Sequence, residues 1–223
     1  MNAAHERDAW RRVWNERDAP RTDWNGYEAC FKTLTEYEAF TVDLTALIVA
    51  ELRIGSLDSV TDLGCGSGRV AYGVACHAQQ VKAFDFSQPA LAVAQEKRSA
   101  PNITYQWADL HDVPLDEIPA AGKAYAVGSF MYLADKDHVW RLTDGLLARG
   151  TELLLLDMPD ADIADERPRD YDTGEFKHLT FRESDFTSRY ADAQILRGRL
   201  PAYVNDAVRF GVHLSPPNAI NGQ

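Results

Sequence analysis

The stretch Asp62-Leu63-Gly64-Cys65-Gly66-Ser67-Gly68 carries the strongest structural signal in the chain. The residues before it, Ser59–Leu63, have the pattern of a strand, and the residues that follow, 68–78, have the pattern of a helix. Glycines between a strand and a helix let the backbone turn tightly and let a ligand lie against the main chain. The N-terminus of the helix adds free N–H groups and a dipole that favours a carboxylate. We therefore expect a ligand-binding loop at residues 62–68.

Strand and helix patterns continue to alternate on both sides of this loop. The further strands are expected at residues 81–84, 103–107, 124–128, 151–156, 193–200 and 208–214. The helices are expected at residues 36–54, 68–78, 88–98 and 135–148. Such an alternation predicts an α/β domain with a doubly wound, mostly parallel seven-stranded sheet, Rossmann-like, with helices on both faces. Residues 157–190 interrupt the rhythm, and we expect a long excursion there, which in a compact domain is usually functional.

Two acids follow the next two predicted strands. Asp85 ends the second strand, 21 residues after Gly64, and Asp109 follows the third. An acid in the first of these places can accept hydrogen bonds from ribose hydroxyls, in nicotinamide-binding proteins as well as in others. Taken singly, each acid is better explained as a helix cap or a solvated loop residue. Their joint placement after consecutive strands, in phase with the glycine loop, favours contact with a bound cofactor.

The glycine loop resembles the first motif of the class I S-adenosylmethionine-dependent methyltransferases, D-x-G-x-G-x-G, without a gap. The dinucleotide fingerprint G-x-G-x-x-G, in contrast, places its third glycine one residue later. The resemblance covers about residues 59–157 and implies S-adenosylmethionine as the cofactor, with Asp109 receiving the adenine amino group. The cofactor-binding residues that it implies lie at the ends of the first four strands: Asp62, Gly64, Cys65, Gly66, Gly68, Asp85, Phe86, Asp109, Leu110, Gly128, Ser129 and Phe130. Within a single domain over residues 1–223, we expect an N-terminal helical cap (1–57), a cofactor-binding core (58–157) and an acceptor-side excursion with a final strand pair (158–223).

The methyl acceptor is less well defined, because the fourth strand lacks the acid that is common at its end in this family. A hydroxyl or amine acceptor needs a base, and the candidates are His178, Asp157 and His138, although a solvated or core role is the better explanation for any one of them alone. His111 is a further candidate, but it follows Asp109 closely and is expected beside the adenine rather than the methyl group. We expect Trp24, Tyr27, Phe31 and Tyr132 to bind the acceptor. Because aromatic faces stack on sugar rings, a sugar or a sugar-bearing metabolite is the first guess.

The composition of the chain limits the classes of molecule that it is expected to bind. The 223 residues carry a formal net charge of −11, which disfavours nucleic acid and anionic membranes. The short basic pairs Arg11-Arg12 and Lys97-Arg98 are expected on solvated helix faces. Three cysteines without a C-x-x-C pattern suggest neither disulfides nor zinc. Asp157, Asp160 and Asp162 could hold a divalent ion, but their loose spacing favours a solvated acidic loop, and we expect no metal site. The N-terminal residues contain no apolar signal region and no stretch is long enough to span a bilayer, so we expect a cytoplasmic enzyme acting on a small molecule.

Two alternatives to a methyltransferase stay open at this stage. A nicotinamide-dependent oxidoreductase would use a similar loop and a similar acid, but the glycine spacing and the absence of a Tyr-x-x-x-Lys motif count against it. A protein that keeps the fold without catalysis would show degenerate cofactor motifs, whereas those of this chain are intact.

Overall fold

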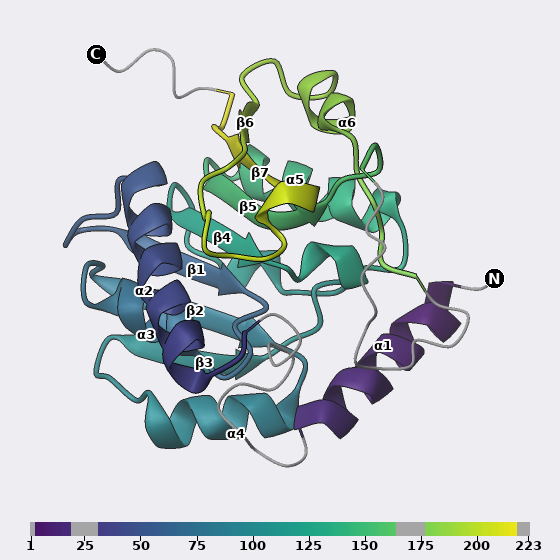
Figure 1. Cartoon of the computed structure of the whole chain (residues 1–223). Coiled ribbons are helices and arrows are strands. Elements are labelled where there is room, and N and C mark those ends of the chain that lie inside the picture. The colour runs from purple at the N-terminus through teal and green to yellow at the C-terminus, as the bar shows by residue number, and fades with distance from the viewer. Residues whose placement is uncertain (1–2, 19–30, 164–176, 218–223) are drawn as a thin grey trace.

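The computed structural model describes residues 3–18, 31–163 and 177–217, and the expected alternation of strands and helices is present in it (Figure 1). The strands are β1 (Ser59–Leu63), β2 (Gln80–Asp85), β3 (Ile103–Trp107), β4 (Lys123–Val127), β5 (Glu152–Pro159), β6 (Gln194–Leu196) and β7 (Arg209–Leu214). The α-helices are α1 (Ala3–Asp18), α2 (Leu34–Glu51), α3 (Arg69–Ala75), α4 (Gln88–Lys97), α5 (Lys136–Ala148) and α6 (Glu183–Thr187). Three short 3-10 turns complete the list: η1 (Leu115–Glu117), η2 (Phe130–Tyr132) and η3 (Asp206–Val208).

The strands form one seven-stranded sheet in the order β3-β2-β1-β4-β5-β7-β6. The first five strands pair in parallel, while β7 runs antiparallel to both β5 and β6. The strand order reverses direction between β1 and β4, and ligands bind outside the carboxyl ends of the strands at such a switch point. The prediction of a doubly wound, mostly parallel, seven-stranded sheet is confirmed.

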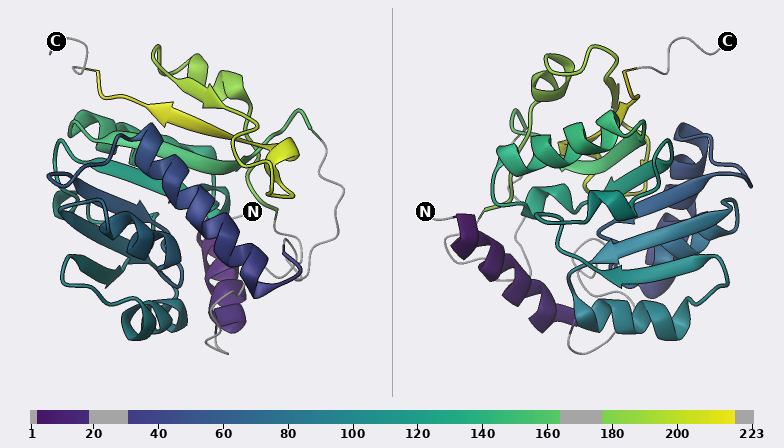
Figure 2. Two further views of the ribbon diagram at one scale, coloured as in Figure 1. Left: turned by 60° about the vertical axis from the view of Figure 1, so that its left-hand side comes forward. Right: turned by 180° about the vertical axis from the view of Figure 1, so that it is seen from behind.

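Helices cover both faces of the sheet (Figures 1 and 2). On one face, α2 and α3 bury side chains such as Leu44, Ile48 and Val74 against Val60 and Leu154. On the other face lie α5 and the segment around α6, whose Phe181 and Phe186 are fully buried. The ends of the predicted excursion are therefore part of the core.

Local signals in the sequence explain where the helices begin. Ser87 caps α4 as expected, because its hydroxyl accepts the N–H of Ala90. Asp135, expected inside the helix, is instead the N-cap of α5 and accepts the N–H of His138. The expected cap segment contains two helices with different surroundings: α2 packs on α3 and the sheet, whereas α1 lies beside α4 and is separate from that layer (Figure 1).

The fifth strand is longer than expected and irregular. Its pairing with β7 shifts register between Leu155 and Met158, so that β5 carries one more residue than its partner there. Asp157, within this bulge, has φ of 60°, a left-handed conformation that is uncommon outside glycine. Among the helices in the described ranges, none has both the length and the hydrophobicity needed to cross a membrane.

Candidate active site

The glycine loop connects β1 to α3 in a left-handed path. Gly64, Gly66 and Gly68 have φ of 93°, 53° and 78°. A Cβ on Gly64 would lie 2.5 Å from the Cβ of Ser129, and one on Gly68 would lie 2.7 Å from the Tyr105 hydroxyl, so these two glycines are needed for packing. A Cβ on Gly66, in contrast, would meet no atom within 4 Å. The open side of the loop is therefore at Gly66, where a ligand can approach the main chain.

The carboxylate of Asp85 holds this loop in place. It accepts hydrogen bonds from the N–H of Gly66 at 2.8 Å and from the N–H of Ser87 at 2.7 Å. Behind the loop, Arg98 donates to the carbonyl oxygen of Ser67 at 2.8 Å and is 8% exposed. The expectation that Arg98 lies on a solvated helix face is wrong, because the long side chain turns inward to bind a loop carbonyl. A carboxylate has about four lone-pair sites, so Asp85 can still accept hydrogen bonds from a ligand.

Asp62 lies below the loop and is buried. Burial raises the pKa of its carboxyl to about 7, against the opposing effect of the hydrogen bond that the Tyr125 hydroxyl donates at 2.7 Å. The charge of Asp85 raises it further. Burial also raises the pKa of the neighbouring Cys65 thiol, which therefore stays protonated and is a poor nucleophile.

Asp109 is the centre of an ion cluster between β3 and the N-terminal helix. Arg7 and Arg11 of α1 donate to its Oδ2 atom at 3.0 and 2.6 Å, and the backbone N–H of His111 donates to Oδ1. Burial raises the pKa of Asp109, but the hydrogen bonds from His111 and the charge of Arg7 outweigh it and hold the pKa well below its usual range. The expectation of a solvated Arg11 is wrong as well. Helix α1 thus covers the acid that the family resemblance assigns to adenine.

The other residues assigned to the cofactor side differ in exposure. Phe86 is partly exposed, and its carbonyl oxygen accepts the indole N–H of Trp107. Leu110 and Phe130 are 9% and 1% exposed and pack in the core. Ser129 donates to the carbonyl oxygen of Leu63 at 2.6 Å, which joins the end of β4 to the glycine loop.

Asp157 lies next to the end of β4. A Cβ on Gly128 would be 2.8 Å from the Asp157 Oδ2 atom, and Gly128 has φ of 61°. The hydroxyl of Tyr203 donates to Asp157 Oδ2 at 3.2 Å and accepts a hydrogen bond from Asn205. Arg209 also lies beside Asp157, with its Nε atom 3.8 Å from Asp157 Oδ1. Tyr203 and Arg209 were missed in the sequence because they stand in a predicted turn and at the start of a strand.

His178 and Tyr132, which were expected on the acceptor side, lie together under α1. The ring of His178 stacks on Trp10 with centroids 5.1 Å apart and meets Tyr132 edge-on at 4.9 Å. Trp14 also meets Tyr132 edge-on, with ring centroids 5.2 Å apart. The N-terminal helix and the end of the excursion therefore share one aromatic cluster. Trp24 and Tyr27 lie outside the described residues.

Phe31 and His138 have other surroundings. Phe31 is 7% exposed and packs on Tyr37, Phe40 and Tyr203. His138 lies in the first turn of α5, with Nδ1 2.6 Å from Asp135 and its ring edge-on to His111. The three candidate bases thus stand in three different places, and of these only Asp157 adjoins Gly128.

Asp160 and Asp162, the two other acids considered for a metal site, are paired with arginines. Asp160 binds Arg197, and Asp162 binds Arg182 at 2.9 Å. Within residues 3–18, 31–163 and 177–217, no group of three His, Cys, Asp or Glu side chains is placed to hold a metal ion.

Comparison with known families agrees with this geometry. The sequence model of a family described as "Methyltransferase domain" matches residues 60–150, which run from β1 to the end of α5 and include the glycine loop, Asp85 and Asp109. Residues 60–150 therefore carry a methyltransferase domain. The prediction of an S-adenosylmethionine-dependent methyltransferase is confirmed by this match, and solved proteins of the same fold contain S-adenosylmethionine or S-adenosylhomocysteine. No curated protein matches the sequence.

Solved methyltransferases share the fold of this domain at low sequence identity. Phosphoethanolamine N-methyltransferase 1 of Haemonchus contortus superposes with a TM-score of 0.71 at 18% identity over 100% of this chain, which spans 51% of that protein. The N-methyltransferase NodS of Bradyrhizobium japonicum has a TM-score of 0.63 at 17% identity, covering 92% of this chain and 97% of its own. CalS10, an amino pentose methyltransferase of Micromonospora echinaspora, has a TM-score of 0.58 at 13% identity, with 78% and 90% covered.

Proposed function

We propose that this chain transfers the methyl group of S-adenosylmethionine to a hydroxyl or amine of a small molecule, at the carboxyl ends of β1, β4 and β5. The single observation that carries the proposal is the open space over Gly66, in a loop where both flanking glycines are packed. The net charge of −11 supports a small-molecule acceptor over a nucleic acid.

In this proposal the residues around that space bind the cofactor along its length. Asp85 would accept hydrogen bonds from the ribose hydroxyls, and Asp109, with Leu110 beside it, would contact the adenine once α1 has moved. The backbone of Gly64, Gly128 and Ser129 borders the methionine end. Because α1 covers Asp109 through Arg7 and Arg11, we expect this helix to move when the cofactor enters and leaves.

When bound, S-adenosylmethionine supplies a methyl group that is already activated on a positive sulfur. The work of the chain is therefore to align the acceptor with that methyl, to exclude water and to take up the acceptor's proton. Asp157 is the candidate for the last task, because it alone of the three predicted bases lies at the end of the strand next to Gly128. His178 and His138 remain weaker candidates.

The structural neighbours leave the acceptor class open. One of them was solved in complex with phosphoethanolamine, and another is an amino pentose methyltransferase. An amine and a sugar-bearing metabolite are both compatible with these neighbours, so the finer assignment depends on the chain's own acceptor-side residues.

A thermal unfolding assay with each cofactor tests the proposal. S-adenosylmethionine or its demethylated product at 100-fold over its dissociation constant should add about 2.7 kcal/mol to the free energy of unfolding, whereas NAD should add none. Stabilisation by NAD alone would favour an oxidoreductase. Binding without turnover on any acceptor would favour a non-catalytic protein of the same fold.

A further inference from the structure

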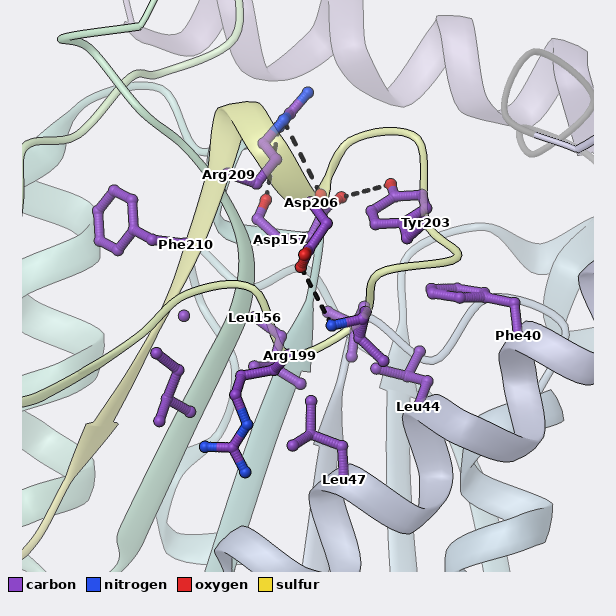
Figure 3. A pocket seen from close by; sticks show the side chains of 14 residues that line it. Phe40, Leu44, Leu47, Leu156, Asp157, Arg199, Tyr203, Asp206, Arg209 and Phe210 are labelled. Atoms are coloured by element: carbon purple, nitrogen blue, oxygen red, sulfur yellow. Dashed lines mark hydrogen bonds and ion pairs between the residues drawn. The ribbon is translucent and has the colours of Figure 1, made fainter.

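A crevice opens beside Asp157, bordered by α2, the ends of β4 and β5, β7 and the segment between β6 and β7 (Figure 3). Its empty volume is about 490 Å³ with the solvent at its mouth included. Because that volume includes solvent at the mouth, the enclosed part is smaller, and we expect a small molecule with one ring or a short chain to fit there.

Asp157 is aimed at this crevice by the irregularity of β5. The bulge between Leu155 and Met158 and the left-handed backbone of Asp157 turn the carboxylate out of the strand's normal alternation. A left-handed residue that is not glycine costs roughly 1–2 kcal/mol, and such strain often occurs where a side chain must be aimed for function. Gly211, opposite the bulge, has no room for a Cβ, which would lie 2.7 Å from Leu156.

The crevice is next to the methyl-bearing end of the expected cofactor site. Strands β1, β4 and β5 are neighbours, at a spacing of about 4.8 Å each, so Asp157 stands about 10 Å across the sheet from the glycine loop. Gly128 lies between the two, with its N–H bonded to the carbonyl oxygen of Leu156 at 3.0 Å. An acceptor in the crevice would therefore meet Asp157 and the methyl group at the same end.

The rest of the lining is predominantly apolar. Leu44 and Leu47 of α2 line the crevice together with Leu200. The ring of Phe40 stacks on Tyr203 at 4.7 Å (Figure 3). The charged groups have partners in the protein: Arg199 binds Glu51, and Asp206 accepts the N–H of Leu200. Hydrogen-bonding groups for a ligand are concentrated at the end where Asp157 lies.

We propose that the acceptor has an apolar body and one N–H or O–H nucleophile, which donates to Asp157, and that it is not a sugar. This rests on the proposed methyltransferase function. A sugar carries hydroxyls around its whole ring, and those placed against the leucines would lose their hydrogen bonds to water without replacement. In the reaction, the acceptor's lone pair forms the bond to the methyl carbon while the carbon–sulfur bond breaks and its electron pair stays on sulfur. The acceptor's proton passes to Asp157 and then to solvent, and the products are the methylated acceptor and S-adenosylhomocysteine.

Three probe molecules test this with the full chain. Benzylamine and 4-methylphenol supply an N–H and an O–H on an apolar ring, and glucosamine supplies an amine on a polar ring. Formation of S-adenosylhomocysteine is followed in saturating S-adenosylmethionine, and binding is measured by calorimetry on protein loaded with S-adenosylhomocysteine. We expect kcat/KM for benzylamine or 4-methylphenol to exceed that for glucosamine at least tenfold, and the faster of the two identifies the nucleophile.

Variants of the lining test the location. Leu200→Gln should raise KM for the apolar probe at least fivefold with little change in kcat. Val204→Gln is the matched control, because Val204 is 51% exposed on the same segment and does not line the crevice. Asp157→Asn keeps the size of the side chain and should lower kcat at least 100-fold, with the affinity for S-adenosylhomocysteine unchanged, which also reports that the variant is folded.

Two results would overturn the proposal: equal or faster methylation of glucosamine, or apolar probes that neither bind the loaded protein nor react. An equal effect of the Leu200 and Val204 substitutions would place the acceptor elsewhere. If S-adenosylhomocysteine itself does not bind, the proposed methyltransferase function is wrong. This result is distinct from a failure of the proposed acceptor class, in which S-adenosylhomocysteine still binds.

Discussion

Replacing Gly66 by valine isolates the contribution of the open space over the glycine loop. Gly66 has φ of 53°, and a Cβ added there would have no neighbour within 4 Å, so a valine meets no protein atom at Cβ but occupies the place of the cofactor. The left-handed backbone costs roughly 1–2 kcal/mol for a residue other than glycine. A domain of this size shifts its Tm by about 2–4 °C per kcal/mol, so the apo variant should melt about 2–8 °C lower and still fold.

Gly198 provides the matched control. It also has a left-handed backbone, with φ of 63°, and a Cβ added there would also have no neighbour within 4 Å, but it lies between β6 and β7. Gly198→Val should therefore lose about the same stability and bind the cofactor normally. At 100-fold over its dissociation constant, S-adenosylhomocysteine adds about 2.7 kcal/mol. This raises the Tm by about 5–11 °C in the wild type and in Gly198→Val, and not at all in Gly66→Val.

Thermal unfolding with and without the ligand, followed by calorimetry on the folded variants, measures both effects. The reasoning would be refuted by a ligand-induced shift in Gly66→Val as large as that in Gly198→Val. Gly66 would then be required only for the backbone turn between β1 and α3, and the cofactor would bind elsewhere.

Three further changes test the electrostatics of the site. Asp85→Ala should weaken cofactor binding, measured by calorimetry, by about 1–3 kcal/mol, which is the scale of hydrogen bonds to a charged group. Unchanged affinity would show that the Asp85 carboxylate only stabilises the conformation of the glycine loop. The raised pKa of Asp62, about 7, means that its stabilising contribution is fully present below its unfolded pKa near 3.8 and is lost as the pH rises through 7. Between pH 5 and pH 8 the wild type should therefore lose about 2–3 kcal/mol of its free energy of unfolding, whereas Asp62→Asn should not show this loss. Urea titration at each pH measures the difference. If the stability of the two proteins changes in parallel with pH, the prediction is wrong. The double variant Arg7→Gln/Arg11→Gln removes the charged hydrogen bonds that hold α1 against Asp109. The dissociation rate of the cofactor, measured by stopped-flow, should therefore rise about tenfold. An unchanged rate would show that α1 does not cover the cofactor.

The fold could be predicted from the sequence because its signals are local. The strand and helix periods, the cap at Ser87 and the glycine spacing at residues 62–68 each depend on near neighbours in the chain, and each has its counterpart in the structure. The parallel sheet follows from the alternation, since helical crossovers between consecutive strands place them side by side in one direction. The two acids after β2 and β3 were found for the same reason.

The acceptor side could not be predicted, because it is assembled from distant segments. Asp157 was a candidate from its place at a strand end, but its left-handed backbone comes from a bulge that depends on pairing with β7, more than 50 residues away. Tyr203 gave no signal of its own, and its hydroxyl reaches Asp157 only because the segment between β6 and β7 folds over β5. Arg11 was expected to be solvated because the sequence does not reveal that α1 packs beside Asp109.

By itself, the sequence determined the α/β sheet, the glycine loop and the acids that follow β2 and β3, since short-range patterns and strand ends are written along the chain. The tertiary structure alone decided that α1 binds Asp109, that Tyr203 and Arg209 flank Asp157, and that a mainly apolar crevice adjoins Gly128. The physical reason is that burial and ion pairing depend on which distant segments meet, and that is set by how the helices and the antiparallel β7 pack on the sheet.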